Sequence, residues 1–244
     1  MDSWNLMLFA LVMTGAGFTQ SCIGFGYAAV AMSFLPYFMD VRLGNLSVSL
    51  SAIAPMVIAI WWYRKQLDWT NLSWTLLGAL LMMPVGLLAF AYLPADILVR
   101  GTGLAILLIL LQQKPTKGFP QLSASMRFGC ARAGAISGFL AGAVGIGGPP
   151  IAAFAYRQPW DPRRFKVFVL AFLLAESLIK VAGVAAVGWV DRKVLVHTAV
   201  AIPFALAGGQ LGILMAKRMH PDRFRRVVLV MLVFASLGMI VRGS

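Results

Sequence analysis

The sequence predicts an all-α membrane protein made of two inverted-topology repeats, each a broken-helix hairpin followed by three transmembrane helices. Three observations lead to this prediction: the composition, an apolar stretch interrupted by glycine and proline, and a second copy of that stretch in the other half of the chain. Of the 244 residues, 60% are hydrophobic and 12% are charged, and the mean hydropathy is +0.84. Because soluble domains carry about 25% charged residues, the chain is predicted to lie in a lipid bilayer.

The interrupted stretch is 138–156, which reads GFLAGAVGIGGPPIAAFAY. Glycines recur there at every fourth residue, which leaves one helix face open to a close neighbour; they are Gly134, Gly138 and Gly142. The residues that interrupt the helix are Gly145, Gly147, Gly148, Pro149 and Pro150. Glycine adopts backbone angles that other residues avoid, and proline lacks an N–H donor, so one helix is expected to end near Gly145 and the next to begin around Pro149. Free backbone groups are tolerated in hydrocarbon only where protein or water covers them, so this break is expected to line a site.

The first half of the chain repeats the pattern. A shift of 138 − 17 = 121 places Gly17-Phe18 over Gly138-Phe139. The same shift superimposes two further pairs, Gly24-Phe25-Gly26 on Gly145-Ile146-Gly147 and Asp40-Val41-Arg42 on Asp161-Pro162-Arg163. Later the shift becomes 222 − 96 = 126, where Asp96 and Arg100 meet Asp222 and Arg226. Ordered matches of this kind indicate an internal duplication.

In the first repeat, Ser3–Met39 is a charge-free run of 37 residues. A single membrane-spanning helix needs about 20 residues, so this run is expected to turn back at Gly24-Phe25-Gly26, with Gln20 and Ser21 on the approach. Three spans are expected to follow, at 43–63, 69–95 and 101–113 with its flanks. The predicted organisation is a first transmembrane repeat at 1–111, a cytoplasmic linker at 112–127 and a second repeat at 128–244.

The second repeat opens with the charge-free run 133–156, whose two limbs are expected to have about 12 residues, or roughly 18 Å of helix. That length is too short for a hydrocarbon core of about 30 Å, so a hairpin that enters and leaves on one side is predicted. The expected spans after it are 167–190, 194–216 and a last one that ends at Val241.

The distribution of cations predicts the orientation, because short cytoplasmic loops are rich in lysine and arginine. Nine cations flank the second-half spans on one side: Arg157, Arg163, Arg164, Lys166, Lys217, Arg218, Arg223, Arg225 and Arg226. They and the linker are predicted to be cytoplasmic and both termini periplasmic, which gives halves of opposite orientation. The net charge of +13 is therefore assigned to topology and not to nucleic-acid binding. Inverted repeats with broken helices are typical of secondary transporters that hold a substrate at mid-membrane. A free helix N-terminus near Gly26 or Pro149 favours an anion.

Two groups of polar residues inside apolar segments have alternative interpretations. Gln20 and Ser21 either bind the substrate or hydrogen-bond neighbouring helices. Glu176 and Lys180, four residues apart in one predicted span, form either a structural ion pair or a relay for protons or substrate, which makes them possible coupling residues. Neither a pair of catalytic carboxylates nor a metal-ligand cluster is recognisable near the breaks, so no catalytic residue, metal or cofactor is expected.

The glycine motif GFxxxxxGxG in both halves and the GIGGPP break resemble the TauE/SafE family, the sulfite exporter-like permeases. The resemblance implies a permease of the bacterial inner membrane that exports sulfite, sulfoacetate or related small anions. It also implies a substrate-binding lining of Gly24 and Gly26 in one half and Gly145, Gly147, Gly148 and Pro149 in the other. The expected partners are the anion and the bilayer, with the coupling ion and the oligomeric state open, a homodimer being one option. The alternatives are a membrane-embedded enzyme that acts on a lipid-linked substrate, and a purely structural subunit.

Overall fold

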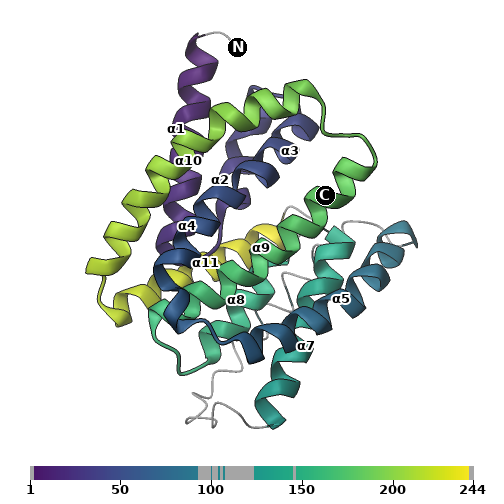
Figure 1. Ribbon diagram of the computed structural model, residues 1–244, viewed down its shortest axis with the longest axis vertical. Coiled ribbons are helices and arrows are strands. Elements are labelled where there is room, and N and C mark those ends of the chain that lie inside the picture. The colour runs from purple at the N-terminus through teal and green to yellow at the C-terminus, as the bar shows by residue number, and fades with distance from the viewer. Residues whose placement is uncertain are drawn as a thin grey trace. The chain divides into compact units, whose positions relative to one another are not determined.

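The computed structural model describes residues 3–92, 100, 104, 107, 124–144 and 147–241. Throughout these ranges the regular structure is helical (Figure 1). The expected span 101–113 falls largely outside the described residues, as do Asp96 and most of the linker.

The helix boundaries repeat along the chain. The first half contains α1 (Ser3–Ile23), α2 (Tyr27–Phe34), η1 (Leu35–Tyr37), α3 (Val41–Ser51), α4 (Ile53–Tyr63), η2 (Arg64–Gln66) and α5 (Trp69–Tyr92). The second half contains α7 (Ala124–Val144), α8 (Gly148–Arg157), α9 (Pro162–Ala186), α10 (Arg192–Arg218) and α11 (Pro221–Val241). The starts of α7, α8 and α9 follow those of α1, α2 and α3 by 124 − 3, 148 − 27 and 162 − 41, each 121 residues. The shift found from glycine motifs therefore also relates the helices.

The matched Asp-x-Arg motifs both begin helices. The Oδ1 atom of Asp40 accepts a hydrogen bond from the Leu43 backbone N–H at 2.9 Å, and Oδ1 of Asp161 accepts one from the Arg164 N–H at 3.2 Å. Each aspartate satisfies a backbone donor that has no partner within its own helix. The duplicated motif therefore sets the starts of α3 and α9.

Among the described residues, four helical segments are long and apolar enough to cross a membrane: Trp4–Ile23, Arg42–Gln66, Pro162–Ala186 and Arg192–Arg218. The last three overlap the spans expected at 43–63, 167–190 and 194–216. The second of them contains α3 and α4, which meet at Ala52, and ends with η2.

The expected limb length is wrong for α7, which has 21 residues and begins nine residues before the charge-free run. Its extent was underestimated because Arg127 and Arg132 lie within the helix; the Arg132 guanidinium is 5.7 Å from the centre of the Phe128 ring. The helices that follow the two breaks, α2 and α8, have 8 and 10 residues and are too short to cross a bilayer on their own.

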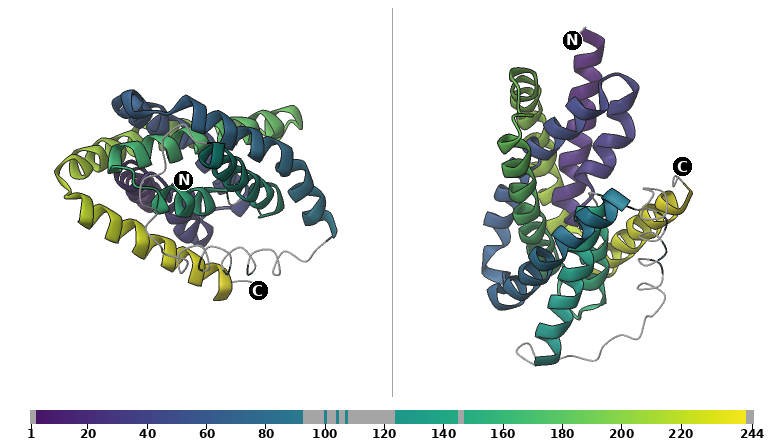
Figure 2. Two further views of the ribbon diagram at one scale, coloured as in Figure 1. Left: turned by 90° about the horizontal axis from the view of Figure 1, so that it is seen from below. Right: turned by 90° about the vertical axis from the view of Figure 1, so that its right-hand side faces the viewer.

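The chain divides into two compact units. Unit 1 contains Met1–Arg64 and Leu174–His220, and unit 2 contains Lys65–Leu173 and Pro221–Ser244. Within unit 1, α1 lies along α10, and within unit 2, α5 lies along α7 (Figures 1 and 2). The single helix α9 supplies residues to both units.

Glycine allows close contact between α1 and α10 in unit 1. A Cβ atom at Gly208 would overlap the Thr14 carbonyl, and one at Gly212 would overlap the Phe18 carbonyl. Because these contacts advance in the same direction along both helices, α1 and α10 run parallel.

The same holds for α5 and α7 in unit 2, where Gly134 faces the backbone of Thr75 and Gly138 faces that of Ala79. This pair of helices is therefore also parallel. The spacing of glycine at every fourth residue has the close-packing role that the sequence predicted.

Candidate functional site

The first helix break lies between α1 and α2 in unit 1. Gly24 and Gly26 have φ values of 108° and 103°, in the left-handed region that side chains with a Cβ atom rarely adopt. The Gly24 N–H closes α1 by donating to the Gln20 carbonyl at 2.7 Å, and the Val30 N–H donates to the Gly26 carbonyl at 2.9 Å. The amides before Val30 in α2 have no carbonyl partner within the helix, and Gly26 offers no side-chain cap. The break therefore presents free N–H groups and the positive end of a helix dipole.

Gln20 and Ser21, predicted to approach this break, are 1% and 0% exposed. Oε1 of Gln20 and Oγ of Ser21 have no hydrogen-bond partner among the described residues. Oγ of Ser21 lies 3.0 Å from where Gly209 would carry a Cβ atom, so this hydroxyl is directed toward α10. Buried polar atoms without a partner are costly, which makes both residues candidates for binding a polar ligand.

A buried hydrogen bond joins the first break to α3. The Tyr27 hydroxyl lies 2.9 Å from Oγ of Ser51, although the two residues are 24 positions apart. Since the start of α2 meets the end of α3, these two helices run antiparallel. This pair was not anticipated, because tyrosine and serine in an apolar segment carry no spacing that marks them as partners.

The second break lies between α7 and α8 in unit 2. Gly147, with φ of −90°, precedes α8, and Gly148, Pro149 and Pro150 form its first turn, as expected. Gly145 lies outside the described residues. The Ser137 hydroxyl donates to the Gly147 carbonyl and fixes the break against α7. The sequence did not identify Ser137 as a site residue, because the corresponding residue in the first repeat, 121 positions earlier, is Ala16.

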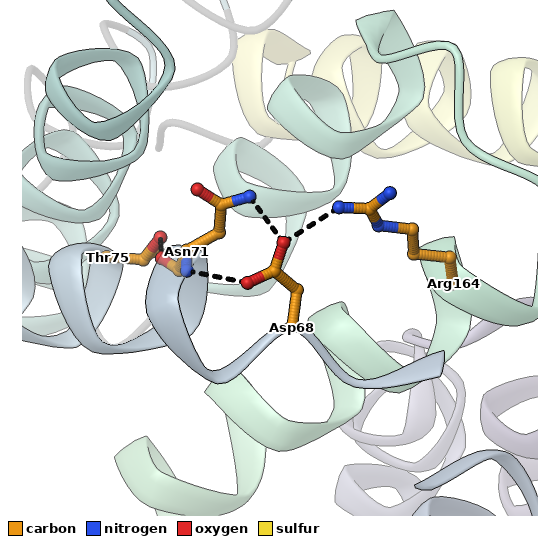
Figure 3. A network of polar contacts seen from close by, with 4 residues as sticks. All are labelled: Asp68, Asn71, Thr75 and Arg164. Atoms are coloured by element: carbon orange, nitrogen blue, oxygen red, sulfur yellow. Dashed lines mark hydrogen bonds and ion pairs between the residues drawn. The ribbon is translucent and has the colours of Figure 1, made fainter. Parts of the chain in front are cut away.

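Unit 2 also contains a polar network that joins the starts of α5 and α9 (Figure 3). Oδ2 of Asp68 lies 2.8 Å from Nη2 of Arg164 and accepts a second hydrogen bond, also at 2.8 Å, from Nδ2 of Asn71. Oδ1 of Asp68 accepts from the Asn71 backbone N–H at 3.1 Å, so the same carboxylate caps α5. The Arg164 guanidinium lies 5.0 Å from the centre of a Trp160 ring. Asp68 and Arg164 are 96 positions apart, so the sequence did not identify them as an ion pair.

Basic side chains near helix ends contact aromatic rings and backbone carbonyls of other segments in the same unit. In unit 1, Nζ of Lys217 lies 3.7 Å from the centre of a Trp62 ring, and the Arg42 guanidinium lies 4.2 Å from that of Trp189. In unit 2, Nη2 of Arg225 donates to the Tyr156 carbonyl at 3.0 Å.

Lys180 is one of the two charged residues within the predicted span that corresponds to α9. It lies in unit 1 and contacts α3 of the same unit. Its Nζ atom donates to Oδ1 of Asn45 and to Oγ of Ser49, both at 2.9 Å. Glu176 lies one helical turn earlier in α9. The lysine is thus held by two uncharged oxygen atoms from another helix.

This arrangement is suited to binding an anion by hydrogen bonds. The first break supplies amide donors, a partial positive charge and buried polar side chains. Within the described residues, no three histidine, cysteine or acidic side chains are grouped as a metal site would require.

Comparison with known proteins agrees with this chemistry. The family model described as sulfite exporter TauE/SafE matches residues 9–239. A curated protein from Cupriavidus necator, called probable sulfite/organosulfonate exporter TauE, is 25% identical over 229 residues, which cover 91% of this chain and 88% of that protein. No solved structure matches significantly.

Proposed function

Because the chain belongs to the sulfite exporter TauE/SafE family, and is therefore a multi-pass membrane transporter and not an enzyme, we propose that it exports small sulfur-containing or organic anions such as sulfite or sulfoacetate. We place it in the bacterial inner membrane, with the linker 112–127 in the cytoplasm and both termini in the periplasm. The name of the Cupriavidus necator relative supports the substrate class.

The observation that carries this proposal is the first helix break. Gly24 and Gly26 turn the chain so that the first amides of α2 have no partner within the helix, and Gln20 and Ser21 are buried on the preceding turn. In hydrocarbon each unsatisfied backbone group costs several kcal/mol, whereas an oxyanion would accept hydrogen bonds from such amides. We assign Gln20, Ser21, Gly24 and Gly26 to substrate binding. By the internal repeat we add Gly145, Gly147, Gly148 and Pro149, so that the anion is bound at mid-membrane between the two hairpins.

The inverted relation of the repeats is part of the proposal. It is supported by α9, whose first turn contains Arg164, the partner of Asp68 at the start of α5. At its other end, α9 is followed by Asp191, which caps α10. In unit 2, α5 thus begins beside the first turn of α9, whereas in unit 1 the chain enters α10 from the C-terminal end of α9, and this difference supports an inverted relation.

The membrane potential favours the proposed direction of transport. A negative cell interior drives an anion outward with about 2.3 kcal/mol per charge per 100 mV. Export therefore needs no coupled ion, whereas import would require protons or sodium.

The test is efflux of radiolabelled sulfoacetate from proteoliposomes that contain the purified protein. We expect efflux that saturates with substrate, accelerates when the outside is made positive and is inhibited by sulfite. Protein-free liposomes are the control for leakage. Efflux no faster than from these liposomes, for both sulfoacetate and sulfite, would contradict the proposed function.

A further inference from the structure

Lys180 has hydrogen-bonding capacity that its contacts in α3 do not use. An ammonium group has three N–H donors, of which two are directed to Asn45 and Ser49. Ser49 can only accept from Lys180, because its own hydroxyl donates to the Asn45 carbonyl at 2.8 Å. Within the part of the chain that the structure describes, Nζ of Lys180 makes no further hydrogen bond and Nδ2 of Asn45 makes none, although the Glu176 carboxylate attracts the ammonium electrostatically. A positive charge and amide donors therefore face the same space.

A second cation lies one helical turn away on the same face of α3. Positions 42, 45 and 49 are separated by three and four residues, which places them along one side of a helix. The Arg42 guanidinium stacks on Trp189 at 4.2 Å. This stripe begins at the first turn of α3 and ends about two turns further in, roughly 10 Å along the axis.

The stripe is separate from the first helix break. Ser51, which bonds to Tyr27 beside that break, is two residues beyond Ser49 and thus about 200° around α3. Lys180 therefore does not belong to the group of Gln20, Ser21, Gly24 and Gly26.

We propose that Lys180 and Asn45 form a second binding station for a small oxyanion, approached by way of Arg42. This inference rests on the proposed function, because the solute is the exported anion. The third N–H of Lys180 and Nδ2 of Asn45 donate to the anion, and Ser49 holds the ammonium in place. Along α3, the station lies between Arg42 in the first turn and Ser51 beside the first helix break. An exported anion that leaves the break would therefore reach the station next.

The competing explanation is that Lys180 only fastens α9 to α3, with Glu176 neutralising its charge. Asn45→Asp separates the two explanations because it preserves the shape of the side chain. A carboxylate beside Nζ would compete with the anion for the ammonium, so the station predicts at least a tenfold higher KM for sulfoacetate. Simple fastening predicts a stronger contact, a higher melting temperature and an unchanged KM.

Three further variants complete the experiment. Lys180→Gln is expected to raise KM at least tenfold, and Glu176→Gln to leave it within twofold of the parent or lower it. Lys193→Gln, which removes a cation from the first turn of α10 outside the stripe, is the matched control and is expected to leave KM unchanged. The station is overturned if Asn45→Asp and Lys180→Gln both stay within twofold of the parent, or if Glu176→Gln reproduces the loss of Lys180→Gln.

Equilibrium binding of radiolabelled sulfoacetate to the purified protein separates failure of the station from failure of the proposed function. A parent protein that moves no anion contradicts the proposed function. In that case the station is upheld if Lys180→Gln and Asn45→Asp each weaken binding at least tenfold, and it is overturned if they do not.

Discussion

Gly138 in α7 lies against the backbone of Ala79 in α5, where no Cβ atom would fit. In the other unit Gly17 in α1 lies against Ala205 in α10 in the same way. The two contacts correspond, since 138 − 17 = 121 and 205 − 79 = 126 are the shifts that relate the two halves of the sequence. The repeat therefore extends from sequence motifs to packing, and each long hairpin helix packs on a helix from the other half of the chain.

Replacing either of these glycines by alanine is expected to destabilise the protein. In Gly17→Ala and Gly138→Ala the new methyl group meets backbone atoms, which cannot rotate away, so we expect a loss of about 1–3 kcal/mol. The measurement is thermal unfolding of the detergent-solubilised protein. Gly15→Ala is the matched control, because nothing lies within 4 Å of its Cβ position. Equal stability of all three variants would contradict the close packing.

Gly26→Ala tests the backbone conformation at the first break. A residue with a Cβ atom at φ of 103° is strained by about 1–2 kcal/mol, and relief of that strain would turn the α2 amides away from the site. We expect a lower melting temperature together with at least a tenfold loss of sulfoacetate efflux.

Gly188→Ala provides the control for this experiment. Gly188 also has a positive φ, 75°, but nothing lies within 4 Å of its Cβ position and it follows α9, away from the breaks in sequence. It should lower the melting temperature while efflux stays near that of the parent. Similar efflux in Gly26→Ala and Gly188→Ala would remove Gly26 from the site.

A double-mutant cycle on Asp68 and Arg164 is expected to show a coupling energy of about 1 kcal/mol. The pair is short, at 2.8 Å, but its side chains are 23% and 15% exposed, so solvent weakens the attraction. Asp68→Asn and Arg164→Gln, singly and together, supply the cycle; asparagine is a good N-cap, so the change isolates the charge. Asp161→Asn, at a capping aspartate, is the control. Additive effects of the two changes would show that the ion pair contributes nothing.

The Tyr27–Ser51 hydrogen bond is expected to hold α2 against α3. Tyr27→Phe removes a buried hydrogen-bonding hydroxyl and should cost about 1 kcal/mol of stability. Combined with Ser51→Ala, it should cost less than the sum of the single changes. Tyr156→Phe is a suitable control, because the contact of Tyr156 with Arg225 uses its backbone carbonyl. A loss in Tyr156→Phe as large as that in Tyr27→Phe would contradict a specific role for the bond.

The sequence predicted those features that depend on local residue chemistry. Gly24 and Gly26 mark the first break because their backbone angles exclude other residues, and Pro149 and Pro150 mark the start of α8. The extent of α7 was missed because charge-free runs do not reveal a helix that contains Arg127 and Arg132.

Contacts between distant segments required the structure. Nothing in the spacing of Asp68 and Arg164, or of Asn45 and Lys180, identifies them as partners, because only the fold brings these residues together. The Glu176–Lys180 spacing drew attention to an (i, i+4) pair, whereas the hydrogen bonds of Lys180 go to α3.

The central claim, that a small anion binds at the helix breaks, is tested most directly by crystallising the protein with selenite, the selenium analogue of sulfite. Anomalous scattering from selenium then locates the anion. We predict a peak within hydrogen-bonding distance of the first amides of α2 or α8. Peaks found only at surface cations, at a selenite concentration that saturates inhibition of efflux, would contradict the claim.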